Sequence, residues 1–253
     1  VSPPDILGFQ GQSFMHTDFR LSSSGESVYL NDPLGNLVDS ITFGALPSNI
    51  SYGVSFENDI YVAYQNPTPG EQNDNFEFSG VLGVPLTFSH DGGNISNAIV
   101  LEISGDGTED EIRYTFDYTE PTENSNLYTG PLTIDETTIV RAKAFKAGYI
   151  SLHSNTRNYF YDIESSHPII HLVTDEYNLF DYDYGIYAYG PPDYGGYPYF
   201  GANFWEDWER PVHISYYENN ELEFSANAGI KIAGAYSRGW DQKSLSLFAR
   251  GEY

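Results

Sequence analysis

Two cationic side chains near the C-terminal end have the type and spacing to bind an anion. Arg238 lies in a polar loop, Gly234 to Gln242, and Lys243 opens the run that follows it. The runs on either side of the loop, 230–233 and 244–249, alternate apolar and polar residues, which is typical of half-buried strands. We therefore expect a hairpin whose loop directs a guanidinium and an ammonium group at a phosphate or carboxylate. The alternative is a surface hairpin with solvated charges.

A second candidate site is a tyrosine-rich stretch that runs from Tyr177 to Tyr199. It contains eight of the 22 tyrosines, together with prolines and glycines that are unusual in regular strands. Tyrosine rings offer flat amphipathic faces for a sugar or a protein partner. The alternative is a long irregular insertion whose rings pack on the adjacent sheet. The predicted contact residues are Tyr182, Tyr184, Tyr187, Tyr189, Tyr194, Tyr197 and Tyr199.

Three aspartates in the same stretch could ligate a metal ion. Asp181, Asp183 and Asp193 offer hard oxygen ligands of the kind that calcium prefers, although their spacing matches no established calcium loop. The sequence contains no nucleophile elbow, no Walker loop and no carboxylate pair at a catalytic spacing. No catalytic residue is predicted within this chain.

Several short motifs occur in order between Ser166 and Tyr253. They are His167-Pro168-Ile169-Ile170, Asn178-Leu179-Phe180-Asp181, Gly185-Ile186-Tyr187, Trp205-Glu206-Asp207-Trp208-Glu209-Arg210-Pro211, Asn227-Ala228-Gly229-Ile230-Lys231-Ile232, Ser237-Arg238 and Gln242-Lys243-Ser244-Leu245. Together they resemble the opening of the CotH-type spore-coat kinase family.

The resemblance implies an atypical, secreted, protein-kinase-like domain that uses ATP and a divalent metal. The strand from Gln242 to Arg250 would belong to its nucleotide-binding lobe, with Lys243 and Arg238 at the matching phosphate-facing positions. The family's catalytic and metal-binding aspartates would lie beyond Tyr253. We therefore expect the chain itself to be inactive and to hold no cofactor, and a longer form to be the kinase.

The middle of the sequence contains another set of motifs: Ile112-Arg113-Tyr114-Thr115-Phe116-Asp117, Glu120-Pro121-Thr122, Leu127-Tyr128-Thr129-Gly130-Pro131-Leu132 and Thr138-Ile139-Val140-Arg141-Ala142-Lys143-Ala144. These resemble the chitobiase C-terminal-like domain. The resemblance implies a small β-sandwich that acts as a spacer beside catalytic domains.

The front of the sequence carries Gly25-Glu26-Ser27-Val28-Tyr29-Leu30, Asp32-Pro33-Leu34-Gly35-Asn36-Leu37-Val38-Asp39 and Pro67-Thr68-Pro69-Gly70, with His16 to Leu21 upstream. These resemble the second half of a bacterial lamin-tail domain, an immunoglobulin-like sandwich. The expected domains are thus a lamin-tail-like half at 1–76, a chitobiase-like sandwich at 77–163 and a truncated kinase-like part at 164–253.

The elements that must position these residues are strands. Short β-favouring runs recur along the chain, Gly, Pro, Asn and Asp punctuate them, and 40% of the residues are hydrophobic, which is enough for packed cores. We predict an all-β to β-rich fold: tandem immunoglobulin-like sandwiches followed by the β-rich N-terminal part of a kinase-like domain. The sequence has no cysteine and therefore no disulfide or thiolate metal site.

The charge of the chain bears on its partners. Its 11 basic and 36 acidic residues give a net charge of −25, which repels nucleic acid and anionic lipid. No long apolar run indicates membrane insertion. We expect an internal piece of a secreted or cell-surface bacterial protein whose partners are the other domains of the same chain. The alternative is an adhesion, filament or matrix component that assembles with itself or binds an extracellular protein or glycan.

Overall fold

The computed structural model describes residues 21–22, 24–46, 50–55, 59–68, 71–72, 77–152, 154–163, 165–191 and 196–249. The chain divides into two compact units, residues 1–48 and 49–253. The fold is β-rich, which confirms the predicted class. No helix in this described part is long and apolar enough to cross a membrane. The predicted domain boundaries after 76 and 163 stay predictions.

The first unit contains a single described hairpin, β1 (Glu26–Asn31) and β2 (Leu37–Phe43), paired antiparallel. Its turn is held by the carboxylate of Asp32, which accepts hydrogen bonds from the backbone N–H groups of Leu34 and Asn36. Gly35 has a φ of +87°, a conformation that glycine adopts without a steric penalty. The lamin-tail motif upstream, His16 to Arg20, lies outside the described residues.

The second unit begins with a three-stranded sheet of β3 (Ser51–Val54), β4 (Tyr61–Tyr64) and β5 (Glu77–Phe78). Tyr64 is fully buried there, and its hydroxyl donates to the carbonyl of Val54 over 2.9 Å. The pairing joins residues on both sides of position 76, where the sequence predicted a boundary.

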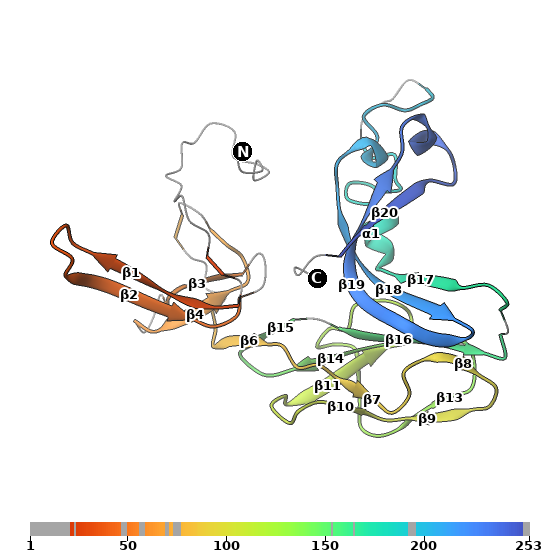
Figure 1. The fold of residues 1–253 in the computed structure, drawn as a ribbon, viewed down its shortest axis with the longest axis horizontal. Coiled ribbons are helices and arrows are strands. Elements are labelled where there is room, and N and C mark those ends of the chain that lie inside the picture. The colour runs from red at the N-terminus through yellow and green to blue at the C-terminus, as the bar shows by residue number, and fades with distance from the viewer. Residues whose placement is uncertain are drawn as a thin grey trace. The chain divides into compact units, whose positions relative to one another are not determined.

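A β-sandwich follows (Figure 1). Its larger sheet has the strand order β12-β11-β14-β16-β8, and three strand pairs, β6 with β15, β7 with β10 and β9 with β13, complete it. The bounds are β6 Gly80–Leu82, β7 Thr87–Phe88, β8 Gly93–Ile95, β9 Ile99–Leu101, β10 Ile103–Ser104, β11 Glu111–Thr115, β12 Asn126–Leu127, β13 Leu132–Ile134, β14 Thr138–Phe145, β15 Tyr149–Ser151 and β16 Asn155–Tyr161.

Alternation along β14 separates the two faces of the larger sheet. Val140, Ala142 and Ala144 are buried in the sandwich core, whereas Arg141 and Lys143 lie on the opposite face. Arg141 pairs with Thr156 of β16, so these two residues share that opposite face. The face therefore carries polar groups and borders the last part of the chain.

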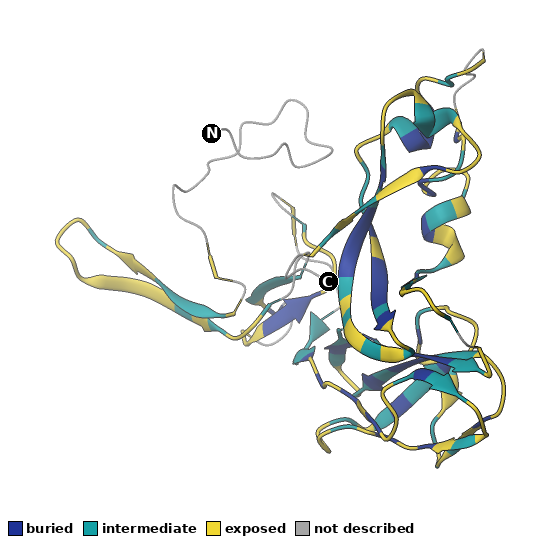
Figure 2. Ribbon diagram, turned by 45° about the vertical axis from the view of Figure 1, so that its right-hand side comes forward, coloured by how far each residue is buried: buried dark blue, intermediate teal, exposed yellow. Residues whose placement is uncertain are grey.

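The last part is a four-stranded antiparallel sheet in the order β17-β18-β19-β20, with bounds Ile169–Val173, Arg210–Glu218, Glu221–Ala233 and Ser244–Phe248. The short helix α1 (Glu176–Phe180) and two 3-10 turns, η1 (Asn203–Trp205) and η2 (Tyr236–Gly239), lie in its connections. A second core packs Ile186, Ala202 and Phe204 against the β18–β19 pair. Figure 2 shows the middle of this pair as buried.

Candidate functional site

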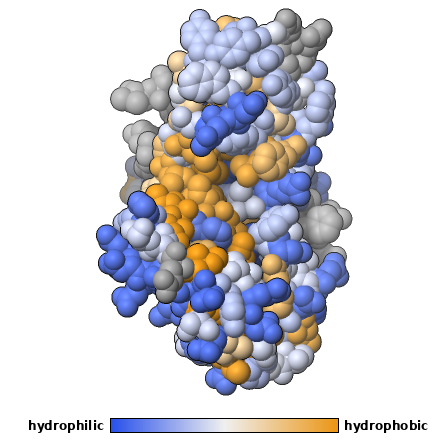
Figure 3. Space-filling model, turned by 90° about the vertical axis from the view of Figure 1, so that its right-hand side faces the viewer, coloured by the Kyte–Doolittle hydropathy of each residue, from blue (hydrophilic) through white to orange (hydrophobic). Residues whose placement is uncertain are grey.

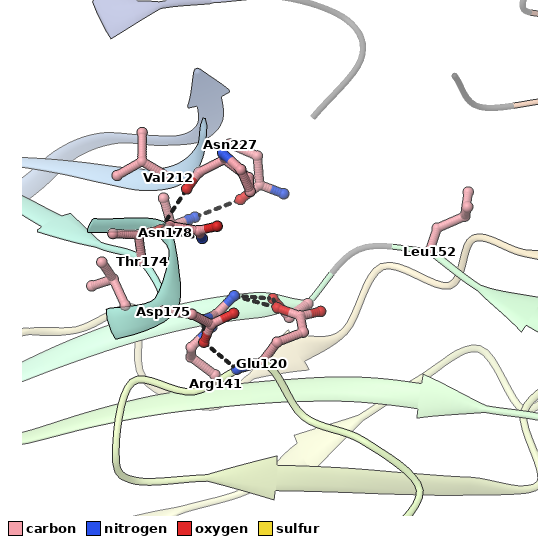
Figure 4. Close-up of a pocket in the computed structure, with 12 residues that line it drawn as sticks. Glu120, Arg141, Leu152, Thr174, Asp175, Asn178, Val212 and Asn227 are labelled. Atoms are coloured by element: carbon pink, nitrogen blue, oxygen red, sulfur yellow. Dashed lines mark hydrogen bonds and ion pairs between the residues drawn. The ribbon is translucent and has the colours of Figure 1, made fainter. Parts of the chain in front are cut away.

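A pocket of about 260 Å³ lies between the polar face of the sandwich and the β17–β18 edge of the four-stranded sheet. Figure 4 shows Thr174, Asn178, Val212 and Asn227 on one side of it, and Glu120, Arg141 and Asp175 on the other. The lining residues come from the turn after β11, from β14, from the segment between β15 and β16, and from β17, α1, β18 and β19. The pocket thus exists only where the two parts of the unit meet.

Arg141 forms the charged wall of the pocket and is only 8% exposed. Its Nη1 donates to the carbonyl of Tyr118 over 2.6 Å and lies 3.5 Å from Asp175 Oδ1. Its Nη2 donates to Glu120 Oε2 and to Ser154 Oγ. Lys143 donates to the other oxygen of Glu120 over 3.1 Å. Two cations and two carboxylates therefore balance one another in this wall.

The opposite wall is made of amides and a histidine. Asn178 Nδ2 donates to Thr174 Oγ1 over 2.8 Å, and Thr174 Oγ1 donates to the carbonyl of Pro211 over 2.6 Å. His213 Nδ1 lies 2.8 Å from Asn227 Oδ1. Because an amide oxygen can only accept, Nδ1 carries the proton in this pair.

Burial lowers the pKa of His213 below its usual value, and the nearby cations Arg157 and Arg141 lower it further. The ring is therefore neutral at physiological pH, and its Nε2 is an acceptor. Nε2 is buried without a hydrogen-bond partner, and so is Nε of Arg141. Buried polar groups of this kind are normally satisfied by protein, water or ligand.

The chemistry that this pocket offers is hydrogen bonding. Its charged groups are already paired with one another, and its histidine is held in one tautomer by Asn227. Such a site suits the binding of a polar ligand.

The predicted anion site, Arg238 and Lys243, is placed in the loop between β19 and β20. Lys243 is 9% exposed, and its Nζ donates to the carbonyls of Arg238 over 2.7 Å and Trp240 over 2.8 Å. The same ammonium lies 4.0 Å from the centre of the Phe204 ring, and burial lowers its pKa. The lysine thus stabilises the position of its own loop against the core.

Arg238 behaves similarly. Its Nε donates to the carbonyl of Gly234 over 2.8 Å, and its Nη1 donates to the carbonyls of Phe204 and Trp205. The ammonium of Lys243 and most of this guanidinium therefore donate to backbone carbonyls in this structure. Phosphate binding by these two residues stays a prediction.

The tyrosines of the predicted contact surface differ in their burial. Tyr187 and Tyr199 pack against the second core, as the alternative interpretation expected. Four others are exposed, with exposed fractions from 38% to 60%: Tyr182, Tyr184, Tyr189 and Tyr197. The guanidinium of Arg210 also stacks over Tyr184, with its Cζ 3.5 Å from the centre of the tyrosine ring. Tyr194 lies outside the described residues.

The predicted calcium ligands are not gathered into a site that the structure describes. Asp181 Oδ1 accepts hydrogen bonds from the backbone N–H groups of Asp183 and Tyr184, over 3.0 and 2.9 Å, in a local turn. Among the described residues there is no group of three or more His, Cys, Asp or Glu side chains that could hold a metal. Asp193 lies outside these residues, so calcium binding stays a prediction.

One face of the β17–β20 sheet is incompletely covered. Ile170, Tyr216 and Phe224 lie in a row across three strands, and Ile170 and Phe224 are 61% and 53% exposed. Leu245 and Leu247 pair with the buried Ile232 and Ile230, yet they are 38% and 40% exposed on the edge strand β20. Figure 3 shows an apolar area, bordered by hydrophilic residues, on the side of the molecule where this sheet lies.

Sequence reasoning missed the residues of the pocket. Asp175, Asn178, His213 and Asn227 come from separate segments, and their convergence depends on how the sandwich packs against β18. Of these four residues, Asn178 and Asn227 belong to motifs that resemble the CotH family. The motifs gave no indication that these side chains share a pocket.

The comparisons with known proteins found a match for part of the sandwich only. Residues 90–156 match the family described as the Chitobiase/beta-hexosaminidase C-terminal domain. The match confirms that resemblance and the β-sandwich character of this part. No curated protein and no solved structure matches the chain. The CotH and lamin-tail resemblances stay predictions.

Proposed function

We propose that this chain is a non-catalytic part of a secreted or cell-surface bacterial multidomain protein. In this proposal the chitobiase-like sandwich holds the β17–β20 sheet in a fixed orientation. The sheet belongs to a kinase-like domain that is completed by further sequence of a longer protein. The observation that carries the proposal is the incompletely covered apolar face of this sheet.

The contact between the sandwich and the sheet supports the orienting role. Asn158 Nδ2 donates to Ser215 Oγ over 3.0 Å, and both residues are 1% exposed. The hydroxyl of Tyr217 donates to the carbonyl of Asn158 over 3.3 Å, and its ring meets Phe160 edge to face at 5.1 Å. Buried, directional contacts of this type hold one orientation, whereas a flexible spacer would leave these groups in water.

The exposed face supports the completion of the sheet by another layer. Burial of apolar surface stabilises a fold by about 25 cal/mol per Å², and a sheet normally buries its apolar face against another element. Ile170 and Phe224 lie at one end of this face, and Leu245 and Leu247 lie at the other end, beyond the middle that is buried in the second core. All four leave a large part of their side chains in water. The resemblance to the CotH family, which places more of the domain past Tyr253, accounts for this surface.

The chain's own residues perform no phosphoryl transfer in this proposal. Lys243 and Arg238 fix the β19–β20 loop through backbone carbonyls. In the longer form, Lys243 and Arg238 would face the phosphates of ATP, as the resemblance implies, and the catalytic and metal-binding aspartates would come from sequence past Tyr253. The proposal therefore assigns activity only to a longer form.

The test compares this chain with a form that extends past Tyr253. Hydrogen exchange is measured on β20, and the fluorescence of an apolar dye reports the exposed face. We expect the extended form to protect β20 and to bind less dye, and Leu245→Ser with Leu247→Ser to reduce dye binding by this chain. Equal exchange and equal dye binding in the two forms would contradict the proposal.

A second test measures ATP binding by the extended form. Titration calorimetry with ATP and Mg²⁺ compares Lys243→Ala with the control Lys231→Ala, and we expect weaker binding only in Lys243→Ala.

A second candidate function is adhesion through the tyrosine surface. Tyr182 and Tyr197 are 60% and 54% exposed, and exposed tyrosines are frequent in binding surfaces. Light scattering after size-exclusion chromatography tests self-assembly. We expect concentration-dependent association that Tyr182→Ala and Tyr197→Ala weaken, and a monomer at all concentrations would remove self-assembly.

A further inference from the structure

We propose that the pocket between β14–β16 and β17–β18 binds a neutral, hydroxyl-rich ligand of about the size of one sugar ring. The proposal rests on the charges, the free hydrogen-bonding groups and the apolar walls of the pocket. It does not depend on the proposed function, because it concerns the described residues of this pocket alone.

The charges of the pocket favour a neutral ligand. Arg141 and Lys143 are paired with Glu120, and Arg141 also contacts Asp175, so the two cations and the two carboxylates of this wall compensate one another. The side chains of Glu120 and Asp175 are each only 34% exposed. A charged ligand would bring an uncompensated charge into a partly desolvated site, which is costly.

The free hydrogen-bonding groups favour hydroxyls. Asp175 Oδ2 and Asn178 Oδ1 accept no hydrogen bond, and Asn227 Nδ2 donates none, within the part of the chain that the structure describes. A ligand that satisfies both kinds of group must donate and accept, and a hydroxyl does both. Several hydroxyls on one rigid ring meet this requirement at a low entropic cost.

The remaining lining and the size of the pocket favour a single ring. Leu152, Val173, Pro211 and Val212 provide apolar surface between the polar groups, which suits the C–H faces of a saturated ring. The volume of about 260 Å³ lies just below the range of pockets that hold drug-sized ligands, which begins at about 300 Å³. A ligand much larger than one ring would extend into solvent.

The first experiment is an NMR titration of the unmodified chain. Glucose, galactose and N-acetylglucosamine are added separately to roughly 50 mM, well above the millimolar affinity expected of a small polar ligand. We expect the side-chain amide signals of Asn178 and Asn227 to shift with at least one sugar, and the signal of the exposed Asn97 to stay unchanged. Glycerol distinguishes a ring from any polyol, and inorganic phosphate distinguishes a neutral ligand from an anion.

Two isosteric variants then test the contacts. Asn227→Asp replaces the free donor and keeps the oxygen that bonds His213, whereas Asp175→Asn replaces the free acceptor and keeps Oδ1. We expect each to weaken sugar binding about tenfold. The matched controls on the exposed surface, Asn97→Asp and Asp135→Asn, should bind like the unmodified chain.

Several results would overturn the proposal. They are the absence of a shift at Asn178 and Asn227 with all three sugars, a larger response to glycerol or phosphate than to any sugar, and equal affinities in the pocket variants and their controls. The titration of the unmodified chain decides the matter even if a variant fails to fold.

Discussion

The contact between the sandwich and the four-stranded sheet can be tested at Tyr217. This side chain is 2% exposed, packs edge to face on Phe160 and donates to the carbonyl of Asn158. Its ring also lies close to Gly93 of β8. We expect Tyr217→Ala to lower the free energy of unfolding by about 4 kcal/mol, the cost of truncating a buried aromatic ring.

The expected loss of unfolding free energy has separate contributions from the ring and from its hydroxyl. The hydrogen bond is long, 3.3 Å, so Tyr217→Phe should cost only about 0.5 to 1 kcal/mol. The edge-to-face pair contributes about 0.5 to 1.5 kcal/mol of the ring's share. For a domain of this size, 4 kcal/mol corresponds to a decrease in Tm of roughly 8 to 16 °C.

The assay is equilibrium unfolding in urea, followed by circular dichroism and by tryptophan fluorescence. All three tryptophans lie in the last part of the chain, so their fluorescence reports the β17–β20 part. In Tyr217→Ala we expect this signal to change at lower urea than the circular dichroism does, because the sheet has lost its anchor. The matched control is Tyr182→Ala, 60% exposed, which should change stability by less than about 0.5 kcal/mol. Equal effects of the two alanine variants would refute the reasoning.

Three further predictions concern buried charged or titratable groups. Arg141→Leu should destabilise the chain by about 2 kcal/mol in urea unfolding, which is less than the roughly 3 to 5 kcal/mol for a fully buried pair, because its carboxylate partners are partly exposed. Burial lowers the pKa values of His171 and His213 in the folded chain, so below about pH 6.5 the unfolded chain binds more protons and stability falls as pH falls. Comparison of unfolding midpoints at pH 7.5 and 5.5 should show this loss, and His213→Gln should reduce it; a midpoint independent of pH in this range would contradict the assignment. Lys243→Met should cost about 1 to 2 kcal/mol, measured by thermal unfolding, because it removes two hydrogen bonds to loop carbonyls; an unchanged Tm would show that the lysine does not fasten the loop.

Local pattern was sufficient to predict many of the strands. The alternation along 230–233 and 244–249 predicted β20 and the end of β19, and the β-branched residues of 139–145 predicted β14. These predictions succeeded because alternation reflects the geometry of a strand with two different faces. The same pattern did not show that Leu245 and Leu247 remain exposed, since burial depends on what covers the face.

The candidate sites were predicted less well, for a related reason. The spacing of Arg238 and Lys243 correctly placed them in and beside a hairpin loop, but it could not show that Phe204 and the loop carbonyls receive the ammonium. The composition of the tyrosine stretch likewise could not separate Tyr187, packed against the core, from Tyr182, exposed to solvent. Each of these outcomes depends on contacts with residues distant in sequence.

The sequence by itself determined the β-rich class, the positions of many strands and the chitobiase-like sandwich, because these follow from local periodicity and short motifs. Only the tertiary structure decided which faces meet. It brought Glu120, Arg141, Asp175, Asn178, His213 and Asn227 to one pocket and left Ile170 and Phe224 exposed at one end of the sheet. The physical reason is that a pocket and an exposed face are properties of packing between segments, and local alternation fixes only the two faces of each strand.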